Sequence, residues 1–313
     1  MLRKKIILII IAGLISIPDF AKSATPYQFL RDNSSARAAG LAGCFVSITD
    51  DASALFYNPA SIMTVTEKRF QATFYKHVLD INSGQVSYLM TSEKLGMFAG
   101  SVDYHSNGSF DRADKYGVRN GTFGANDLSI ATSYANLLDT NLYWGATAKF
   151  IYSNIEKYSS SAIALDAGLL YVIPEKRVTI GLAVLHAGFQ LTTYDGTSED
   201  LPLDILLGVS HRLRGLPMLV NFSFHHLADN QDGFFERFKN FSLGGEIYLG
   251  KYIQLRLGYD NMIRRLTTPD TEKKLSGLCG GAGIKMKDFN FDYSASAVGS
   301  GAYLHRFSIA LDI

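Results

Sequence analysis

The sequence predicts an all-β protein: a transmembrane antiparallel β-barrel of about 14 strands that contains an N-terminal plug segment. Three observations support this class. Apolar and polar residues alternate from Arg69 to the last residue, and tight connections alternate with long polar ones between the predicted strands. The 313 residues also include 20 Phe, 17 Tyr and 28 Gly but only 7 Pro, a composition that is typical of β structure.

The beginning of the chain has the pattern of a secretory signal peptide. A basic start at residues 2–5 precedes an apolar run over residues 6–15, and small residues follow at Ala21 and Ser23. We expect cleavage near Ser23 or Ala24. The alternative is a membrane anchor that the mature chain retains, but the apolar run is shorter than the roughly 20 residues that a spanning helix needs.

Alternation with a period of two defines the predicted strands. Between residues 203 and 210 every second residue is Leu, Ile or Val, and the residues between them are Asp204, Leu206, Gly208 and Ser210. One face of such a strand can meet lipid while the other meets a polar interior. A parallel α/β sheet would instead show continuous apolar runs separated by helical patterns, and we find no helical pattern after Arg69.

The connections indicate how the barrel is oriented. Tight ones, such as residues 92–94 and 214–217, alternate with long polar stretches, such as 105–126 and 227–240. Outer-membrane barrels have short periplasmic turns, longer outer loops and an even number of strands. We therefore expect the protein in the cell outer membrane, in contact with its lipids, with both termini on the periplasmic side. The last strand, residues 303–313, fits barrel closure, although a soluble β protein could end in the same pattern.

Composition and motifs argue against several functions. The formal net charge of +1 offers no electrostatic footprint for nucleic acid. The chain contains neither a Gly-x-Ser-x-Gly nucleophile elbow nor the Gly-Lys-Ser/Thr ending of a phosphate-binding loop. We interpret the glycine-rich run at residues 277–283 as a place where plug and wall approach closely. We therefore expect no enzyme activity and no cofactor.

Two histidines and two cysteines are the residues most suggestive of chemistry. His225 and His226 are neighbours, but adjacent residues of a regular strand point to opposite faces, so we expect one near the rim, one inside and no metal. Cys44 and Cys279 lack the spacing of a metal or redox motif. They could form a disulfide between plug and wall in an oxidising periplasm, or stay two buried thiols, which the usual burial of cysteine favours.

About 40 residues separate the signal peptide from the first strand, which is too long for an unstructured loop in a compact domain. Small residues dominate this segment, so it can fold tightly inside a barrel. Within it, Pro59 fixes its own φ and biases Asn58 away from helix, which marks a stiff corner. The predicted domains are a signal peptide (1–23), a plug (24–66) and a barrel (67–313).

The two acidic residues of the segment, Asp50 and Asp51, are expected to help to seat it. A buried charge without a partner is costly, so one of them should pair with a basic side chain that faces the lumen. Arg256 and Lys285 are the predicted partners. A calcium site at these residues is less favoured, because the spaced acidic pattern and turn glycine of a calcium-binding loop are missing.

The segment resembles the N-terminal hatch of FadL-like outer-membrane barrels, and it is most similar to the PorV/PorQ group of the type IX secretion system. The matching plug residues are Ser35, Arg37, Gly40, Asp50, Asp51, Asn58, Pro59 and Ala60. Further matches to PorQ lie at residues 108–112, 121–123, 125–128, 150–153, 194–197, 201–202 and 255–259. The resemblance therefore covers most of the chain after the signal peptide.

This resemblance implies a fourteen-stranded barrel, plugged by its own N-terminus, in a type IX secretion and cell-surface attachment complex. In that role it would anchor a PorZ-like surface protein, with PorU-like or PorV-like subunits as further partners. Aromatic and arginine side chains commonly anchor interfaces. The candidates in the long loops are Phe110, Arg112, Phe234, Phe235 and Arg237. A rim that binds lipopolysaccharide explains the same loop composition, and the alternative function is that of FadL-like relatives, which pass hydrophobic small molecules across the outer membrane.

Overall fold

The computed structural model describes residues 25–32, 35–77, 81–92, 94–114, 116–231, 233–268, 274–299 and 301–313. The predicted signal peptide lies outside the described residues. Among the residues that the structure describes, no helix is both long enough and apolar enough to cross a membrane.

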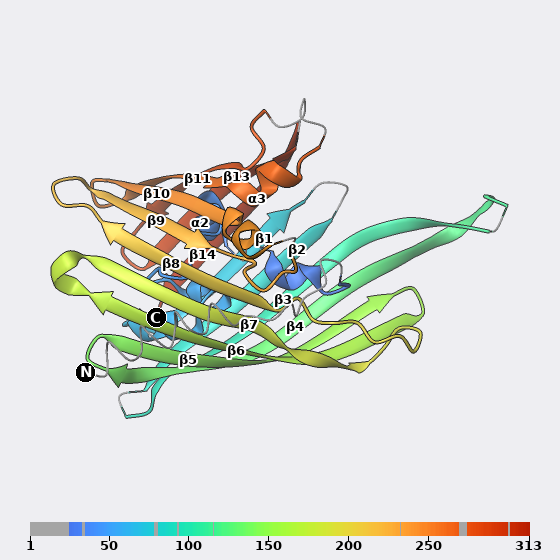
Figure 1. The fold of residues 1–313 in the computed structure, drawn as a ribbon, viewed down its shortest axis with the longest axis horizontal. Helices are drawn as coiled ribbons and strands as arrows, with labels where there is room; N and C mark the ends of the chain where they lie inside the picture. Colours follow the sequence, from blue (N-terminus) through green and yellow to red (C-terminus); the bar gives the residue numbers. More distant parts are fainter. Residues whose placement is uncertain are drawn as a thin grey trace.

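Fourteen antiparallel strands in the described residues close into a barrel (Figure 1), so the predicted class and strand number are confirmed. Each strand pairs with its neighbours in the chain, and β1 closes the ring by pairing with β14, with Arg69 opposite Asp312. The strands are β1 (Arg69–Lys76), β2 (Asn82–Ser92), β3 (Gly96–Ala113), β4 (Arg119–Asp139), β5 (Leu142–Ile155), β6 (Tyr158–Ile173), β7 (Val178–Thr192), β8 (Asp204–Arg212), β9 (Met218–Phe224), β10 (Phe241–Leu249), β11 (Ile253–Asp260), β12 (Leu278–Lys285), β13 (Phe289–Gly299) and β14 (Ala302–Asp312).

The predicted alternation of faces is present in the wall. In β8, Asp204, Leu206 and Ser210 are buried, while Ile205, Leu207 and Val209 are more exposed. In β11, Leu255 and Leu257 are exposed, but Arg256 between them is 2% exposed. The outward side chains are therefore apolar and free to meet lipid, whereas the inward ones are polar, small or, like Leu206, packed against the N-terminal segment.

The connections at one end of the barrel are all tight, whereas the other end carries the three longest ones, residues 193–203, 225–240 and 261–277, beside several short turns. We name these the short-turn end and the long-loop end. The C-terminus lies at the short-turn end, because the end of β14 pairs with the start of β1. The stretch 105–126 was predicted to be a loop, but this prediction was wrong. It continues β3 and β4, which protrude as a long hairpin at the right of Figure 1. Its pairing passes two register shifts, and polar residues and glycines interrupt the apolar ones, so no regular alternation marks it.

The sequence shows no helical pattern after Arg69, and the barrel that the structure describes indeed lacks the parallel strands that such helices would connect. In the described residues, however, the connections contain three short helices: η4 (Pro174–Lys176), η5 (Phe234–Lys239) and α3 (Asn261–Leu266). Each is too short to show a helical period in the sequence. Asp260 begins α3 by accepting hydrogen bonds from the backbone N–H groups of Met262 and Ile263.

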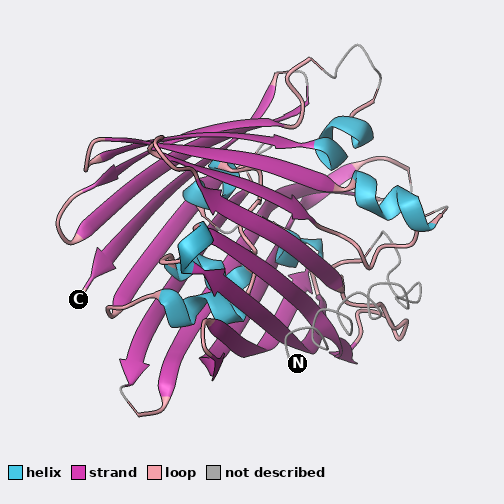
Figure 2. Cartoon of the chain, turned by 60° about the vertical axis from the view of Figure 1, so that its left-hand side comes forward, coloured by secondary structure: helices cyan, strands magenta, loops and turns pink. Residues whose placement is uncertain are grey.

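The N-terminal segment, residues 25–66, lies against the inner faces of the strands, and Figure 2 shows its helices inside the ring of strands. Its helices are η1 (Gln28–Arg31), α2 (Ala36–Gly40), η2 (Ala52–Phe56) and η3 (Pro59–Thr64). Ser35, Asp51 and Asn58 begin the last three, each accepting a hydrogen bond from a backbone N–H of the first turn. The segment thus satisfies its own helix ends with residues that the sequence analysis had singled out.

The expectation of a periplasmic N-terminus does not fit the described segment. The hydroxyl group of Tyr27 is hydrogen-bonded to Ser160, near the long-loop end of β6, and Arg31 forms an ion pair of 2.7 Å with Asp229 in the connection after β9. The segment therefore begins near the long-loop end and runs along the lumen to β1. The even strand number sets only the ends of the wall and not the start of a segment that crosses the interior.

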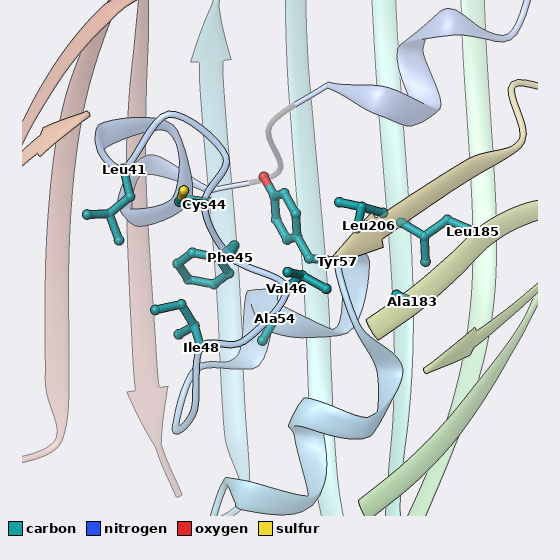
Figure 3. Close-up of a cluster of buried hydrophobic side chains, with 11 residues drawn as sticks. Leu41, Cys44, Phe45, Val46, Ile48, Ala54, Tyr57, Ala183, Leu185 and Leu206 are labelled. Atoms are coloured by element: carbon teal, nitrogen blue, oxygen red, sulfur yellow. The ribbon is translucent and has the colours of Figure 1, made fainter. Parts of the chain in front are cut away.

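An apolar core joins the segment to the wall (Figure 3). Its buried members are Ala38, Leu41, Cys44, Phe45, Val46, Ile48, Ala54 and Tyr57 of the segment with Ala183, Leu185 and Leu206 of β7 and β8. Burial of side chains such as Phe45 and Ile48 contributes roughly 1.5–3 kcal/mol each. The hydrophobic core of this protein thus lies inside the barrel, since its outer surface faces lipid.

Candidate functional site

Three pairs of glycines on neighbouring strands form depressions in the wall that receive the N-terminal segment. The pairs are Gly145 with Gly168, Gly181 with Gly208, and Gly244 with Gly258, and in each pair the two residues are direct partners in the strand register. A β-carbon added to any of these six glycines would lie within 3.0 Å of the segment. The segment therefore approaches the wall more closely than any residue with a side chain would permit.

The Asn58-Pro59-Ala60 corner occupies the first depression. A β-carbon on Gly168 would lie 2.0 Å from the Asn58 side-chain oxygen, and one on Gly145 would lie 2.5 Å from the Pro59 carbonyl carbon. The Asn58 amide donates hydrogen bonds of 2.9 Å to the backbone oxygens of Val46, within the segment, and of Leu169, on β6. Asn58 is fully buried, so it links two parts of the segment to the wall.

Val46 occupies the second depression, between β7 and β8. A β-carbon on Gly181 would lie 2.0 Å from the Val46 carbonyl oxygen, and one on Gly208 would lie 2.5 Å from the Val46 side chain. Next to it, the hydroxyl groups of Ser47 and Ser210 are 2.7 Å apart. The backbone at residues 46–47 is therefore pressed directly onto the wall.

Buried ion pairs hold the segment beside the third depression, where Glu246 on β10 lies opposite Arg256 on β11. Arg37 donates two hydrogen bonds to Glu246 on β10, at 2.7 and 3.0 Å, and one of 3.0 Å to Asp51. Arg256 approaches the same Glu246 at 2.7 Å and Asp292 at 2.5 Å. The Glu246 side chain has no exposed surface, so its charge depends on these two arginines.

The predicted partners of the two aspartates were wrong in identity. Asp51 pairs with Arg37 of its own segment, and Asp50 pairs with Arg69 at the start of β1, at 3.1 Å. Arg256 is engaged by Glu246 and Asp292 instead. The expectation that these carboxylates pair with basic side chains was sound, but the sequence could not show that Arg37 of the same segment lies against Asp51.

A cavity of about 580 Å³ lies between the segment and the wall on the long-loop side. Its apolar lining includes Leu30, Phe56 and Tyr57 of the segment and Leu185 and Leu206 of β7 and β8. Ionisable groups line the rest of it: Arg31, Asp32, His186, Asp204, His225, His226, Asp229, Asp260, Arg265 and Arg306. The outer cavity, as we name it, thus has an apolar side and a charged side.

A second cavity of about 260 Å³ lies on the short-turn side of the segment. Ser47 and Thr49 of the segment line it, together with Val178 and Thr179 of β7 and Ser210 of β8. We name it the inner cavity. Along β7 the outer cavity ends at Leu185 and the inner one begins at Thr179, and between them lies Gly181, covered by Val46. The contact at residues 46–47 therefore separates the two cavities.

Both His225 and His226 face the outer cavity, which corrects the expectation of one rim and one interior residue. Strand β9 ends at Phe224, and His226 has a φ of 54°, so regular alternation does not extend to this pair. The imidazole of His226 is 2.8 Å from Asp204. Burial opposes a charge on His226, but this carboxylate outweighs it and raises the pKa of His226 above its ordinary value. Burial and the neighbouring charge of His226 lower the pKa of His225.

Cys44 and Cys279 are both free and buried, so the two-thiol alternative is confirmed. The Cys44 sulfur lies 3.1 Å from the Ser223 hydroxyl and 3.0 Å from the Ser242 backbone oxygen. Burial raises the pKa of Cys44 to about 12. The thiol is therefore unreactive while the segment is seated.

The candidate partner-binding residues do not all lie on the surface. Phe234 and Phe235 on η5 are exposed, Phe235 by 81%. On the long hairpin, Phe110 stacks on Phe123. Arg237 is 7% exposed, so its guanidinium is not offered to a partner.

The remaining candidate of this group, Arg112, forms an ion pair with Glu156 at 2.6 Å.

The glycine pairs that receive the segment were not identified in the sequence analysis. Glycines at inward positions of predicted strands were the signal that could have found them.

Comparisons with known proteins agree with this architecture. No family model and no curated protein matches the sequence. The crystal structure of the Pseudomonas putida toluene transporter TodX superposes with a TM-score of 0.59 at 11% identity, covering 89% of this chain and 96% of that chain. A Pseudomonas aeruginosa FadL homologue superposes with a TM-score of 0.52 at 12% identity, covering 90% and 98%. The chain has the fold of an outer-membrane β-barrel. With its apolar outer face, this fold places the protein in the outer membrane.

Proposed function

We propose that the protein passes small hydrophobic molecules across the outer membrane, with residues 25–66 acting as the plug that controls passage. One observation carries the proposal: two cavities lie in line along β7 and β8, and the segment's contact with the wall at Val46 and Ser47 lies between them. Displacement of that contact would join the cavities into one path through the lumen. The toluene transporter TodX, which has the same fold, lends this function further support.

The outer cavity suits a small ligand with apolar surface. Its volume of about 580 Å³ lies within the range of roughly 300–1,000 Å³ that is usual for small-molecule sites. Leu185, Leu206 and Tyr57 offer apolar contact, and the ionisable groups opposite them are already paired in part, as Arg31 is with Asp229 and His226 with Asp204. An apolar ligand is bound more readily beside charges that are paired in this way than beside unpaired charges, which would lose more hydration when the ligand binds.

Uptake of toluene by intact cells tests the proposal. The protein is expressed in a Gram-negative host, and the entry of radiolabelled toluene is compared for the wild type, Leu206→Trp and Leu207→Trp. Leu206 lines the outer cavity, whereas Leu207, its neighbour on β8, belongs to the outward face. We expect Leu206→Trp to lower uptake to the level of the empty host and Leu207→Trp to leave it unchanged. Equal uptake in both variants would contradict the proposal.

A second function, anchoring of a surface protein as in PorQ-like barrels, is favoured by one surface feature. Phe234 and Phe235 form an exposed aromatic pair at the long-loop end, with ring centroids 5.5 Å apart. Exposed aromatic clusters are frequent anchors of interfaces.

A pull-down from detergent-solubilised outer membranes tests this second function. The wild type is compared with the Phe234→Ser, Phe235→Ser double variant and with Leu216→Ser, an exposed residue at the short-turn end. Recovery of a surface protein that only the double variant loses would favour anchoring. A protein recovered equally with all three, or none at all, would count against it.

A further inference from the structure

We propose that Asp32, His77 and His105 form a binding site for a divalent transition-metal ion, for which zinc is the appropriate probe. The three residues come from separate parts of the chain: the N-terminal segment, the end of β1 and strand β3. Their ligand atoms all lie within 4.8 Å of one another. Two imidazole nitrogens and a carboxylate oxygen are a ligand set that zinc and related ions accept.

The two distances from Asp32 leave little movement to be made. The Asp32 carboxylate oxygen is 3.8 Å from His77 Nε2 and 3.8 Å from His105 Nδ1. Ligand atoms around a tetrahedral zinc ion, at about 2.0 Å from the metal, are separated by about 3.3 Å, so each of these gaps must close by only about 0.5 Å. The Ser83 hydroxyl lies between the two rings, 3.3 Å from His77 Nε2 and 2.8 Å from His105 Nδ1. A fourth position, for this hydroxyl or for water, is therefore available.

The neighbours of His105 independently support a metal ligand. Its second nitrogen, Nε2, is 2.9 Å from the Tyr75 hydroxyl and 3.3 Å from Asp103, and Tyr75 in turn donates to Asp103 at 2.9 Å. When Nε2 carries the proton and donates a hydrogen bond to these groups, Nδ1 presents its lone pair toward the Ser83 hydroxyl and Asp32, the side on which the ion would bind. A carboxylate that orients the far nitrogen of a histidine is the usual support of a metal-ligating imidazole.

The site would connect the plug to the wall. Asp32 follows η1 of the N-terminal segment and lines the outer cavity, whereas both histidines belong to the wall. Phe29, three residues earlier, already packs against the His105 ring, with centroids 5.1 Å apart. A bound ion would therefore hold the start of the segment against β1 and β3. The His225–His226 pair, which attracted attention in the sequence, does not take part.

Zinc titration of the tag-free mature protein in detergent, by calorimetry, tests this site. We expect one zinc ion per chain, with a dissociation constant in the micromolar range or below. His77→Gln and Asp32→Asn should each weaken binding at least tenfold, and Asp103→Asn, which removes only the support of His105, should weaken it about 10–100-fold. His211→Gln is the control, because His211 is exposed on β8, and it should bind like the wild type.

X-ray absorption at the zinc edge provides a readout that does not depend on stability. Two imidazole nitrogens at about 2.0 Å in the wild type, and one in His77→Gln, would support the assignment. Heat-modifiability on gels verifies that each variant retains the barrel. The proposal is overturned if the wild type binds no zinc, or if His77→Gln and Asp32→Asn bind it as tightly as the wild type, which would place the ion at other residues.

Discussion

Adding one methyl group to the wall at Gly181 should displace the plug contact that separates the two cavities. The new β-carbon of Gly181→Ala would lie 2.0 Å from the Val46 carbonyl oxygen, whereas ordinary contact begins near 3.4 Å. The backbone at residues 46–47 must then move by roughly 1.4 Å to restore ordinary contact, and overpacking of this kind costs about 1–3 kcal/mol. That cost corresponds to an increase of roughly 5–150-fold in the ratio of displaced to seated segment.

The Cys44 thiol reports on this displacement, because it is two residues from Val46 and is buried while the segment is seated. In a Cys279→Ser background, the rate of maleimide labelling at pH 8 should rise by the same roughly 5–150-fold in Gly181→Ala. Gly100→Ala is the matched control, since a β-carbon there would meet no atom within 4 Å. Both variants should remain heat-modifiable, because the strand pairing is untouched. Indistinguishable labelling of the two variants would refute the reasoning that the glycine pairs receive the segment.

Three further predictions concern the contacts that seat the segment and line the outer cavity. Arg37→Met removes the charged hydrogen bonds to Glu246 and Asp51 and should destabilise the seated segment by about 1–3 kcal/mol, seen as faster amide exchange over residues 36–65, with no change in the strands. Asn58→Ala removes the side-chain donor to the backbone oxygens of Val46 and Leu169 and should lower the stability of the seated segment toward denaturant by about 1–3 kcal/mol, without lowering that of the barrel. The pKa of His226 is raised in the folded state, so its pairing with Asp204 stabilises the connection after β9 fully below about pH 6.5 and loses this effect as the pH rises through the folded pKa. His226→Asn, which tolerates the positive φ, should therefore speed amide exchange at residues 225–231 at pH 5 much more than at pH 9, and equal effects at both would contradict the assignment.

The wall could be predicted from the sequence because each strand faces lipid on one side and the lumen on the other. Because the two faces of each strand meet different surroundings, apolar residues recur with a period of two, as at residues 203–210 and 253–260. Counting the segments with this period gave the number of strands. The period is lost where a strand no longer has lipid on one side and the lumen on the other. The hairpin of β3 and β4 beyond Ser106 protrudes past the other strands, so its residues carry no signature that separates a strand from a loop.

The candidate site was harder to predict from the sequence, because it depends on the register of the strands and on contacts between distant residues. Asn58-Pro59-Ala60 marks a corner by local chemistry, and its importance could be inferred. That Gly181 lies opposite Gly208 follows only from the pairing of β7 with β8, and neither glycine is informative alone. In the same way, Asp32, His77 and His105 carry no motif spacing, since three separate elements bring them together.

Locking the segment to the wall and measuring permeation tests the central claim most directly. The Ser47 and Ser210 hydroxyl oxygens are 2.7 Å apart, so Ser47→Cys with Ser210→Cys places two thiols where a disulfide can form. Both native cysteines are replaced by serine, and toluene entry is measured in cells before and after reduction with dithiothreitol. The account predicts that the oxidised protein blocks uptake and that reduction restores it to the level of the cysteine-free parent. Equal uptake in the oxidised and reduced states would contradict the claim that passage depends on the contact at residues 46–47.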